Sequence, residues 1–176
     1  MADLAYPGDE IIPNPEMHYN HTKRIGASPA EIFPWVLQIG KGRGGWYLPL
    51  SWERWLPKCW HASRTINPAW QQLQVGDRVA DYGFDKDDYF DVAYVDRQRT
   101  ILVFKSERLG TVFTWSLIVA ELEAGMSELR LRFRGRIHRT GLGRRLLVLG
   151  GSFMDWATTA PMLAGLKERA EKAHAR

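Results

Sequence analysis

The residues best suited to chemistry by type and spacing lie in the segment GKGRGGWYLPLSWERW, which begins at Gly40. Gly40, Gly42 and Gly45 have the G-x-G-x-x-G spacing that holds a dinucleotide pyrophosphate, and Arg43 lies between them. That chemistry requires a strand before the glycines, a helix after them and an acidic residue about twenty positions later. Here a helix is predicted before the glycines, and Thr65 stands where the acid should be. We therefore predict a flexible turn after a helix end, with no cofactor.

Four aromatic residues follow the glycines, at Trp46, Tyr47, Trp52 and Trp55. The chain has eight Trp residues, which is more than packing alone requires in a domain of this size. Large amphipathic rings are common in ligand-lined cavities and at interfaces. We interpret the four aromatic residues as the lip of a pocket, and Arg43 as the candidate to meet a polar group on the ligand.

Acid–base and metal-binding candidates are scattered. His61, Asp155 and Tyr47 are the residues that a pocket enzyme could use as acid or base. Cys59 and His61 are close in sequence, but a loop leaves their geometry undefined. His18 and His21 would face opposite sides of a strand, so they would not share a metal ion.

The acidic segment around Asp81, Asp85, Asp87, Asp88 and Asp91 raises the question of a calcium loop. Such a loop needs glycine at its sixth position and glutamate at its twelfth. Counted from the second of these aspartates, the two positions hold phenylalanine and aspartate instead. We predict a solvated loop and no metal site.

A second basic feature is the segment LRLRFRGRI, in which Arg130, Arg132, Arg134 and Arg136 alternate with apolar residues. A strand would place the four guanidinium groups on one face. We expect a solvated outer face paired to acids such as Glu121 and those of the 81–91 segment. The alternative is an interaction module that docks anionic surfaces through this face.

The positioning elements follow from the local signals. Ser28, Pro29 and Glu31 mark a helix start, and the helix is expected to reach Ile39 with a kink at Pro34. Further expected elements are a strand over 18–25, short helices over 51–56 and 67–73, strands within 89–96, 100–107, 112–122 and 128–137, and a C-terminal helix from about residue 143, kinked at residue 161. Consecutive strands indicate an antiparallel α+β fold.

Composition narrows the class of protein. A chain of 176 residues with 45% hydrophobic and 25% charged residues is expected to fold as one globular domain, after an irregular lead-in over residues 1–17. The single Cys59 fits a reducing, cytoplasmic location. No export signal is recognised, and the stretch from Leu146 to Leu166 is broken by glycines, an aspartate and a proline, so stable membrane insertion is not expected. The net charge of +4 does not demand a nucleic-acid partner. Oligomeric state is left open.

The segment SPAEIFPWVLQIGKGRGGWYLPLSWERW resembles one found in bacterial SRPBCC proteins, of the START-like, polyketide-cyclase-related superfamily. LQVGDRV and MLAGLKERAE also look like that group, so the resemblance spans most of residues 18–173. It implies a helix-grip fold: a curved antiparallel sheet around a long C-terminal helix, with short helices after the first strand and a cavity between. Members bind lipids, sterols, polyketides or hormones, and a minority catalyse cyclisation or dehydration. No catalytic residue is transferable.

We therefore expect a single helix-grip domain over residues 18–176 that binds a small hydrophobic or amphipathic ligand without catalysis. The alternative is a cofactor-independent cyclase or dehydratase. On the C-terminal helix, an apolar face with small residues either packs in the core or forms the roof of the cavity. The expected ligand-binding residues are Arg43, Trp46, Tyr47, Trp52, Trp55, Phe133, Met154, Thr158 and Met162.

Overall fold

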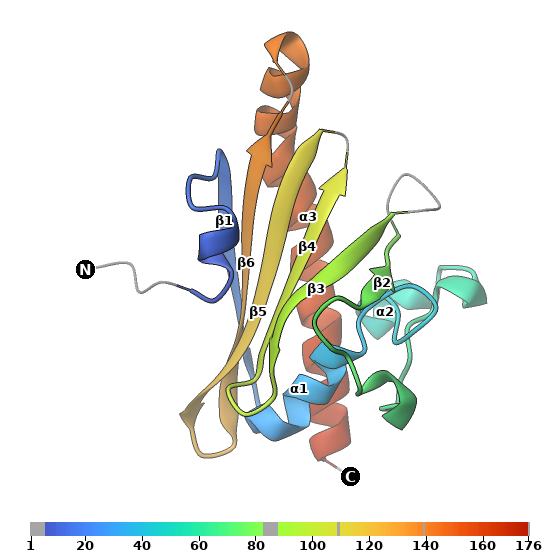
Figure 1. The fold of residues 1–176 in the computed structure, drawn as a ribbon. Coiled ribbons are helices and arrows are strands. Elements are labelled where there is room, and N and C mark those ends of the chain that lie inside the picture. Colours follow the sequence, from blue (N-terminus) through green and yellow to red (C-terminus); the bar gives the residue numbers. More distant parts are fainter. Residues whose placement is uncertain (1–5, 83–87, 109, 139, 176) are drawn as a thin grey trace.

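Six antiparallel strands form one curved sheet in the order β1-β6-β5-β4-β3-β2 (Figure 1). The computed structural model describes residues 6–82, 88–108, 110–138 and 140–175, with the side chains of 142–149 and 154 left out. The strands are β1 (Met17–Ile25), β2 (Arg78–Ala80), β3 (Tyr89–Asp96), β4 (Ile101–Arg108), β5 (Thr111–Glu123) and β6 (Met126–Ile137). β1 forms one edge of the sheet and pairs with β6, so the first and last strands in the sequence are neighbours.

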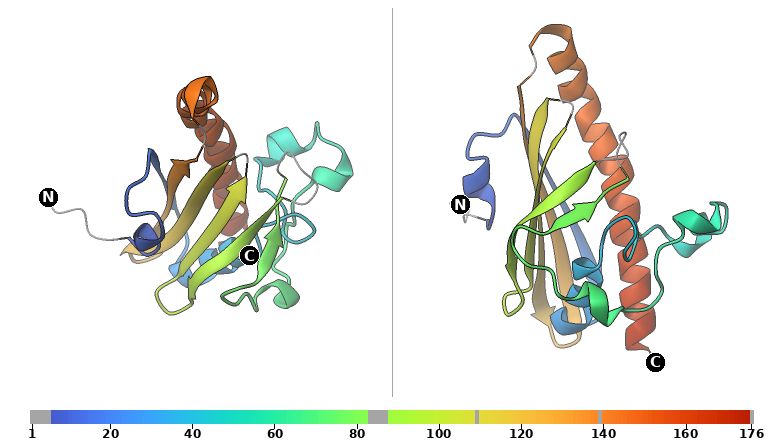
Figure 2. Two further views of the ribbon diagram at one scale, coloured as in Figure 1. Left: turned by 45° about the horizontal axis from the view of Figure 1, so that its top comes forward. Right: turned by 45° about the vertical axis from the view of Figure 1, so that its right-hand side comes forward.

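One long helix, α3 (Gly141–His174), crosses the inner face of the sheet (Figures 1 and 2). The shorter elements α1 (Pro29–Leu37), α2 (Leu50–Glu53), η2 (Lys58–Trp60) and η3 (Pro68–Trp70) all fall between β1 and β2. Buried apolar residues of the strands, α1 and α3 form one core. The expected α+β helix-grip fold is confirmed.

The local start and stop signals explain the first helix. The Glu31 carboxylate accepts the backbone N–H of Ser28 at 2.8 Å, as the capping motif predicts. The helix runs through Pro34 and ends at Leu37, slightly before the predicted Ile39. Strand β2 was not predicted, because a three-residue strand is too short to show an alternating pattern. The C-terminal helix likewise continues through the proline at which a kink was expected.

The glycine loop is a tight turn that is closed on itself. Gly40 and Gly45 exchange backbone hydrogen bonds of 3.3 and 2.9 Å, and Gly44 donates to the Gln38 carbonyl at 2.7 Å. Gly40 and Gly45 have positive φ angles, and a Cβ on Gly44 would lie 2.5 Å from the Gln38 carbonyl oxygen. Because these amides are used within the loop, they form no cradle for a phosphate. Glycine is required here for conformation and close packing.

The described part of the N-terminal lead-in, from residue 6, lies against the outer face of the sheet and includes η1 (Asp9–Ile11) (Figure 2). The Asp9 carboxylate pairs with Arg132 at 2.7 Å and Arg134 at 3.2 Å, and both arginines are buried. Arg134 also donates to the Ile12 and Pro13 carbonyls. The expectation of a solvated face is therefore wrong for Arg132 and Arg134, which are buried and paired with an acid of the lead-in. Arg130 pairs with Glu128 of the same strand, and Arg136 donates to the Asn14 carbonyl.

A buried ion pair attaches the segment between β1 and β2 to α3. Arg169 of α3 donates to Glu53 of α2, and the side chains are 2% and 0% exposed. Its other donors reach the carbonyls of Leu48 and Ser63 at 2.8 and 2.9 Å. A Cβ on Gly165, one turn earlier, would lie 2.5 Å from the backbone of this segment. The segment thus packs directly on the helix backbone, held by one guanidinium.

We predict that Glu53→Gln lowers the free energy of unfolding by about 3–5 kcal/mol, because it leaves the Arg169 charge buried without a counter-charge. Urea denaturation should show a lower midpoint with an unchanged slope. Ser51→Ala, at an exposed position of the same short helix, should change the midpoint little. Equal midpoints for the two variants would contradict the role given to the pair.

Candidate functional site

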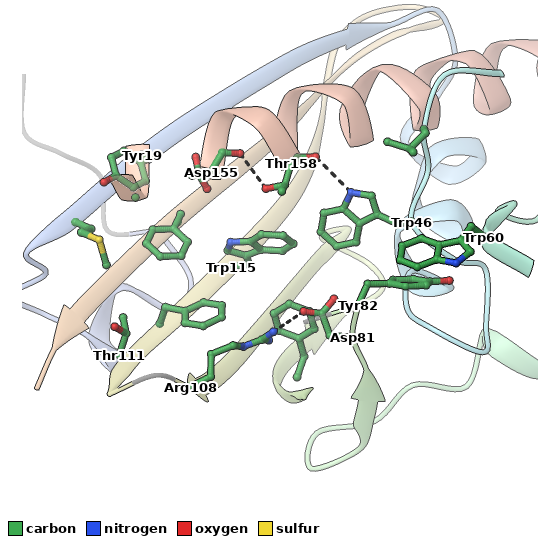
Figure 3. A pocket seen from close by; sticks show the side chains of 16 residues that line it. Tyr19, Trp46, Trp60, Asp81, Tyr82, Arg108, Thr111, Trp115, Asp155 and Thr158 are labelled. Atoms are coloured by element: carbon green, nitrogen blue, oxygen red, sulfur yellow. Dashed lines mark hydrogen bonds and ion pairs between the residues drawn. The ribbon is translucent and has the colours of Figure 1, made fainter. Parts of the chain in front are cut away.

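A cavity of about 460 Å³ lies between the sheet and the middle of α3 (Figure 3). Its wall combines side chains of the strands, the β1–β2 segment and one face of α3. The lining residues are Met17, Tyr19, Trp46, Leu48, Trp60, Asp81, Tyr82, Phe90, Arg108, Thr111, Phe113, Trp115, Phe133, Gly151, Asp155 and Thr158.

Aromatic rings from neighbouring strands form a continuous wall on the sheet side. Phe113 and Trp115 are two residues apart on β5, so strand alternation places both on the inner face. Trp115 contacts Phe90 of β3 with ring centroids 5.3 Å apart, and Phe113 stacks on Phe133 of β6 at 5.4 Å. Trp46 continues the wall from the β1–β2 segment, 5.3 Å from Trp115. The arrangement gives the sheet side of the cavity an apolar, aromatic surface.

Trp46 also connects the glycine loop to α3. Its indole Nε1 donates to the Thr158 carbonyl at 3.3 Å, as Figure 3 shows. Farther along the same segment, Trp60 lies against Tyr82 at 5.6 Å, and Trp60 is half exposed. These rings close the side of the cavity that the strands leave open.

The helix side of the cavity carries one acidic group. Asp155 is 7% exposed, and its Oδ2 lies 2.5 Å from Nε2 of His21 on β1. Its other oxygen lies 3.5 Å from the Thr159 hydroxyl. Burial is the largest influence on Asp155 and raises the pKa of its carboxyl, while the hydrogen bond from His21 opposes that rise. His18 lies on the outer face of β1, so the expectation that the two histidines do not converge is met.

Tyr19, also on β1, lies beside the same turn of α3. A Cβ on Gly151 would lie 3.3 Å from the Tyr19 hydroxyl oxygen, so only glycine leaves this approach open. Burial, and secondarily the charge of Asp155, raise the pKa of the Tyr19 hydroxyl. The hydroxyl therefore keeps its proton near neutral pH and can donate a hydrogen bond.

Arg108 lies across the cavity from Asp155 (Figure 3). Its guanidinium pairs with Asp81 at 2.6 Å and with Asp88 at 3.7 Å. It also lies over the rings of Phe90 and Phe113, at 5.0 and 5.1 Å from their centroids. Because two carboxylates compensate the charge, this arginine stiffens the aromatic wall and does not offer an unpaired cation. Asp85 and Asp87 of the acidic segment lie outside the described residues.

Two donors on the cavity wall have no partner among the described residues. The Trp115 indole Nε1 and the Thr111 hydroxyl are both buried and make no hydrogen bond. Both residues belong to β5 and lie four positions apart, which places them on the same face of the sheet. A buried donor without an acceptor costs about 1–3 kcal/mol. Neighbouring atoms shield both donors in this conformation, so a ligand oxygen that accepted from one of them would require its side chain to turn toward the cavity.

The expected ligand-binding residues divide into three groups. Trp46, Phe133 and Thr158 line the cavity. The side chain of Met154 lies outside the described residues. The others are absent from the described cavity wall: Tyr47 and Met162 are buried in the core, Trp52 and Trp55 are 55% and 79% exposed, and Arg43 donates to the Leu37 and Trp70 carbonyls at 3.0 and 2.7 Å.

The three acid–base candidates are also separated. Asp155 lines the cavity. The Tyr47 hydroxyl donates to the Trp35 carbonyl at 3.0 Å, and burial raises its pKa far above the usual value. His61 Nε2 lies 3.0 Å from the Leu56 carbonyl and so donates to it. Only Asp155 of the three is in a position to meet a ligand.

Most of the strand residues on the wall were missed from the sequence. The alternation in β5 and β6 did indicate an inner face, but it does not tell a cavity wall from a packed core. The pairing of His21 with Asp155 joins residues 134 positions apart, and no local pattern reports such a contact.

No family model matches the chain, and no curated protein matches its sequence. Solved structures do match its fold. Norcoclaurine synthase from Thalictrum flavum matches at 9% identity and a TM-score of 0.55, over 90% of this chain and 96% of that one. The di-domain ARO/CYC protein BexL matches at 16% sequence identity and a TM-score of 0.57, over 91% of this chain and 48% of that one. A solution structure of a protein from Thermobifida fusca matches at 14% sequence identity and a TM-score of 0.51, over 88% of this chain and 93% of that one.

These similarities show the fold alone. The shared fold is a helix grip, in which a curved antiparallel sheet packs around a long C-terminal helix with a cavity between them. Over the described residues, none of the helices is long and apolar enough to cross a membrane.

Titration of Asp155 should be visible in stability. A His21→Gln background removes the neighbouring imidazole, and Tyr19 stays neutral below its raised pKa. Since burial raises the carboxyl pKa above its ordinary 3.8, the folded state holds the proton more tightly, and stability falls as pH rises above about 4. The double variant His21→Gln/Asp155→Asn has no carboxyl group at position 155, so it does not lose stability in this way as the pH rises. Urea denaturation between about pH 4 and about pH 7 should show the double variant gaining relative to His21→Gln; a constant difference would refute the assignment.

Proposed function

We propose that the protein binds a small, largely apolar, ring-containing molecule in the cavity, through stacking on the aromatic wall and one accepted hydrogen bond. The observation that carries this proposal is a cavity that is aromatic on the sheet side and contains an indole N–H with no partner among the described residues. The volume of about 460 Å³ falls within the range of about 300–1,000 Å³ usual for small-molecule sites.

The shape of the wall favours rings over a single acyl chain. The rings of Trp115, Phe90, Phe113 and Phe133 contact one another in a connected series, and Trp46 extends it. Each favourable ring pair adds about 0.5–1.5 kcal/mol beyond the burial of its area, which a saturated chain does not gain. An aromatic or polyketide-like metabolite therefore matches this wall better than a lipid tail does.

The polar groups restrict the ligand further. The carboxylates of Asp81 and Asp88 already balance Arg108, so an anionic ligand meets no uncompensated positive charge there. The Trp115 N–H calls for an acceptor such as a carbonyl oxygen. These groups therefore favour a ligand that is not anionic and carries at least one carbonyl or ether oxygen.

The neighbouring structures support a site for small aromatic molecules. One structure of Thalictrum flavum norcoclaurine synthase, at 11% identity and a TM-score of 0.53, is a complex with dopamine and hydroxybenzaldehyde. The alternative of docking to anionic surfaces has less support, because the lead-in covers Arg132 and Arg134.

Filling the cavity should abolish binding. Gly151→Leu places a side chain beside Met17 and Tyr19, at the Asp155 end of the cavity, whereas a Cβ on the adjacent Gly150 meets nothing within 4 Å. We expect Gly151→Leu to bind the bicyclic ketone 2-tetralone at least about tenfold more weakly, and Gly150→Leu to bind it like the original chain. Isothermal titration calorimetry measures both. Equal affinities, or no binding by the original chain, would overturn the proposal.

The accepted hydrogen bond can be tested with two ligands of one shape. Tetralin is 2-tetralone without the carbonyl oxygen. For the original chain, the ratio of the affinity for 2-tetralone to the affinity for tetralin should be larger than the transfer of the two molecules from water to an apolar solvent predicts. Trp115→Phe should lower this ratio by about five- to tenfold, or about 1–1.4 kcal/mol. Comparing the two ligands in each variant cancels the smaller volume of Phe. An unchanged preference would contradict the role of the indole N–H.

A further inference from the structure

We propose that Asp155 is a general base that removes a proton from the carbon next to the carbonyl group of a ketone bound in this cavity, with His21 as its positioning residue. The cavity would then be the site of an enolisation. This inference rests on the proposed function, because it requires a carbonyl compound to enter the cavity.

The first argument is the position of Asp155. The carboxylate belongs to a residue that lines the cavity, yet its side chain is only 5% exposed. A carboxylate with little water around it is a stronger base toward a bound substrate than one in solution. Burial also raises the pKa of the Asp155 carboxyl, which makes the carboxylate a stronger base. Asp155 therefore combines contact with the cavity and the environment that a base requires.

The second argument is the partner of Asp155. His21 Nε2 lies 2.5 Å from Oδ2 and fixes the orientation of the carboxyl group, while the other oxygen, Oδ1, lies 3.5 Å from the Thr159 hydroxyl. The His21 side chain is 17% exposed, more than three times as much as that of Asp155. The imidazole thus connects a buried carboxylate to bulk water. Protons taken from a substrate can leave by this route, and protons from water can enter by it.

The third argument is the set of donors near the same end of the cavity. Enolisation places negative charge on the carbonyl oxygen, and a neutral donor must meet it. The Trp115 indole N–H is buried and without a partner among the described residues, and in Figure 3 its nitrogen-bearing edge lies on the side of the ring toward Tyr19. The Tyr19 hydroxyl, protonated at neutral pH, lies beside the turn of α3 that carries Gly151 and Asp155.

The step balances without an oxidant, a reductant or a metal. The C–H bond next to the carbonyl breaks, and its proton passes to Asp155. Its electron pair forms the C=C bond of the enolate, and the C=O electrons move onto the oxygen, which accepts from the indole N–H. The protonated carboxyl exchanges its proton with water through His21 and returns a proton to carbon. In D₂O the net change is replacement of one C–H by C–D with release of HOD.

Proton NMR of 2-tetralone in D₂O tests this step directly, because loss of the signals next to the carbonyl reports enolisation. The full-length protein should accelerate that loss above the buffer rate, and Asp155→Asn should lower the acceleration by about 10²-fold or more. Asp91→Asn, whose side chain pairs with Arg78 at the surface, is the matched control and should keep the full rate.

His21 is tested by the pH dependence of the exchange rate, which a merely structural residue would not move. The hydrogen bond from His21 lowers the Asp155 pKa, so His21→Ala should shift the acidic limb of the profile to higher pH. His21→Gln keeps an N–H donor and should return the limb toward its original position. Identical profiles for all three proteins would refute the positioning role.

The outcomes separate the two proposals. Calorimetry on the same samples reports whether tetralone binds. Binding without accelerated exchange overturns the enolisation and leaves the binding function standing, whereas absence of binding overturns both. If Asp155→Asn binds tetralone and exchanges it at the original rate, another group is the base and the assignment is wrong.

Discussion

The fold depends on one buried guanidinium. Arg169 of α3 holds Glu53 and two backbone carbonyls of the segment between β1 and β2, and it lies over the ring of Tyr47 with its carbon 5.1 Å from the centroid. That segment consists of short helices and turns without a strand between β1 and β2, so contacts with α3 help to define its path. A planar group with five donors can define that path from a single point. The position of Trp46 and Trp60 over the cavity follows from it.

The cavity results from two requirements that act against each other. The sheet must bury its inner face against α3, but the strands contribute large rings near the middle of the helix, and α3 contributes Gly151 and Thr158 there. Bulky and small residues face each other, so the layers stay apart in the middle, while Leu163 and Leu166 pack closely nearer the C-terminal end. Space is thus retained where the polar groups are found.

Local signals in the sequence predicted the fold well. Strand alternation, the capping residues of the first helix and the apolar face of the C-terminal helix each depend on neighbours in sequence, and the corresponding elements are present. The site was predicted only in part. Trp46, Phe133 and Thr158 line the cavity, but Arg43 and Tyr47 serve the packing of loops, because a cluster in sequence does not say which side chain faces inward. Contacts such as His21 with Asp155 depend on the tertiary structure alone.

Strand β6 takes part in two structures at once. Its inner residue Phe133 belongs to the cavity wall, and its outer residues Arg132 and Arg134 hold the lead-in through Asp9. The two faces alternate residue by residue along one backbone. A change in the position of the lead-in would therefore act on the same peptide units of β6 that position the ring of Phe133. Substitutions on the outer face of the sheet, away from the cavity, can therefore alter the width of the cavity.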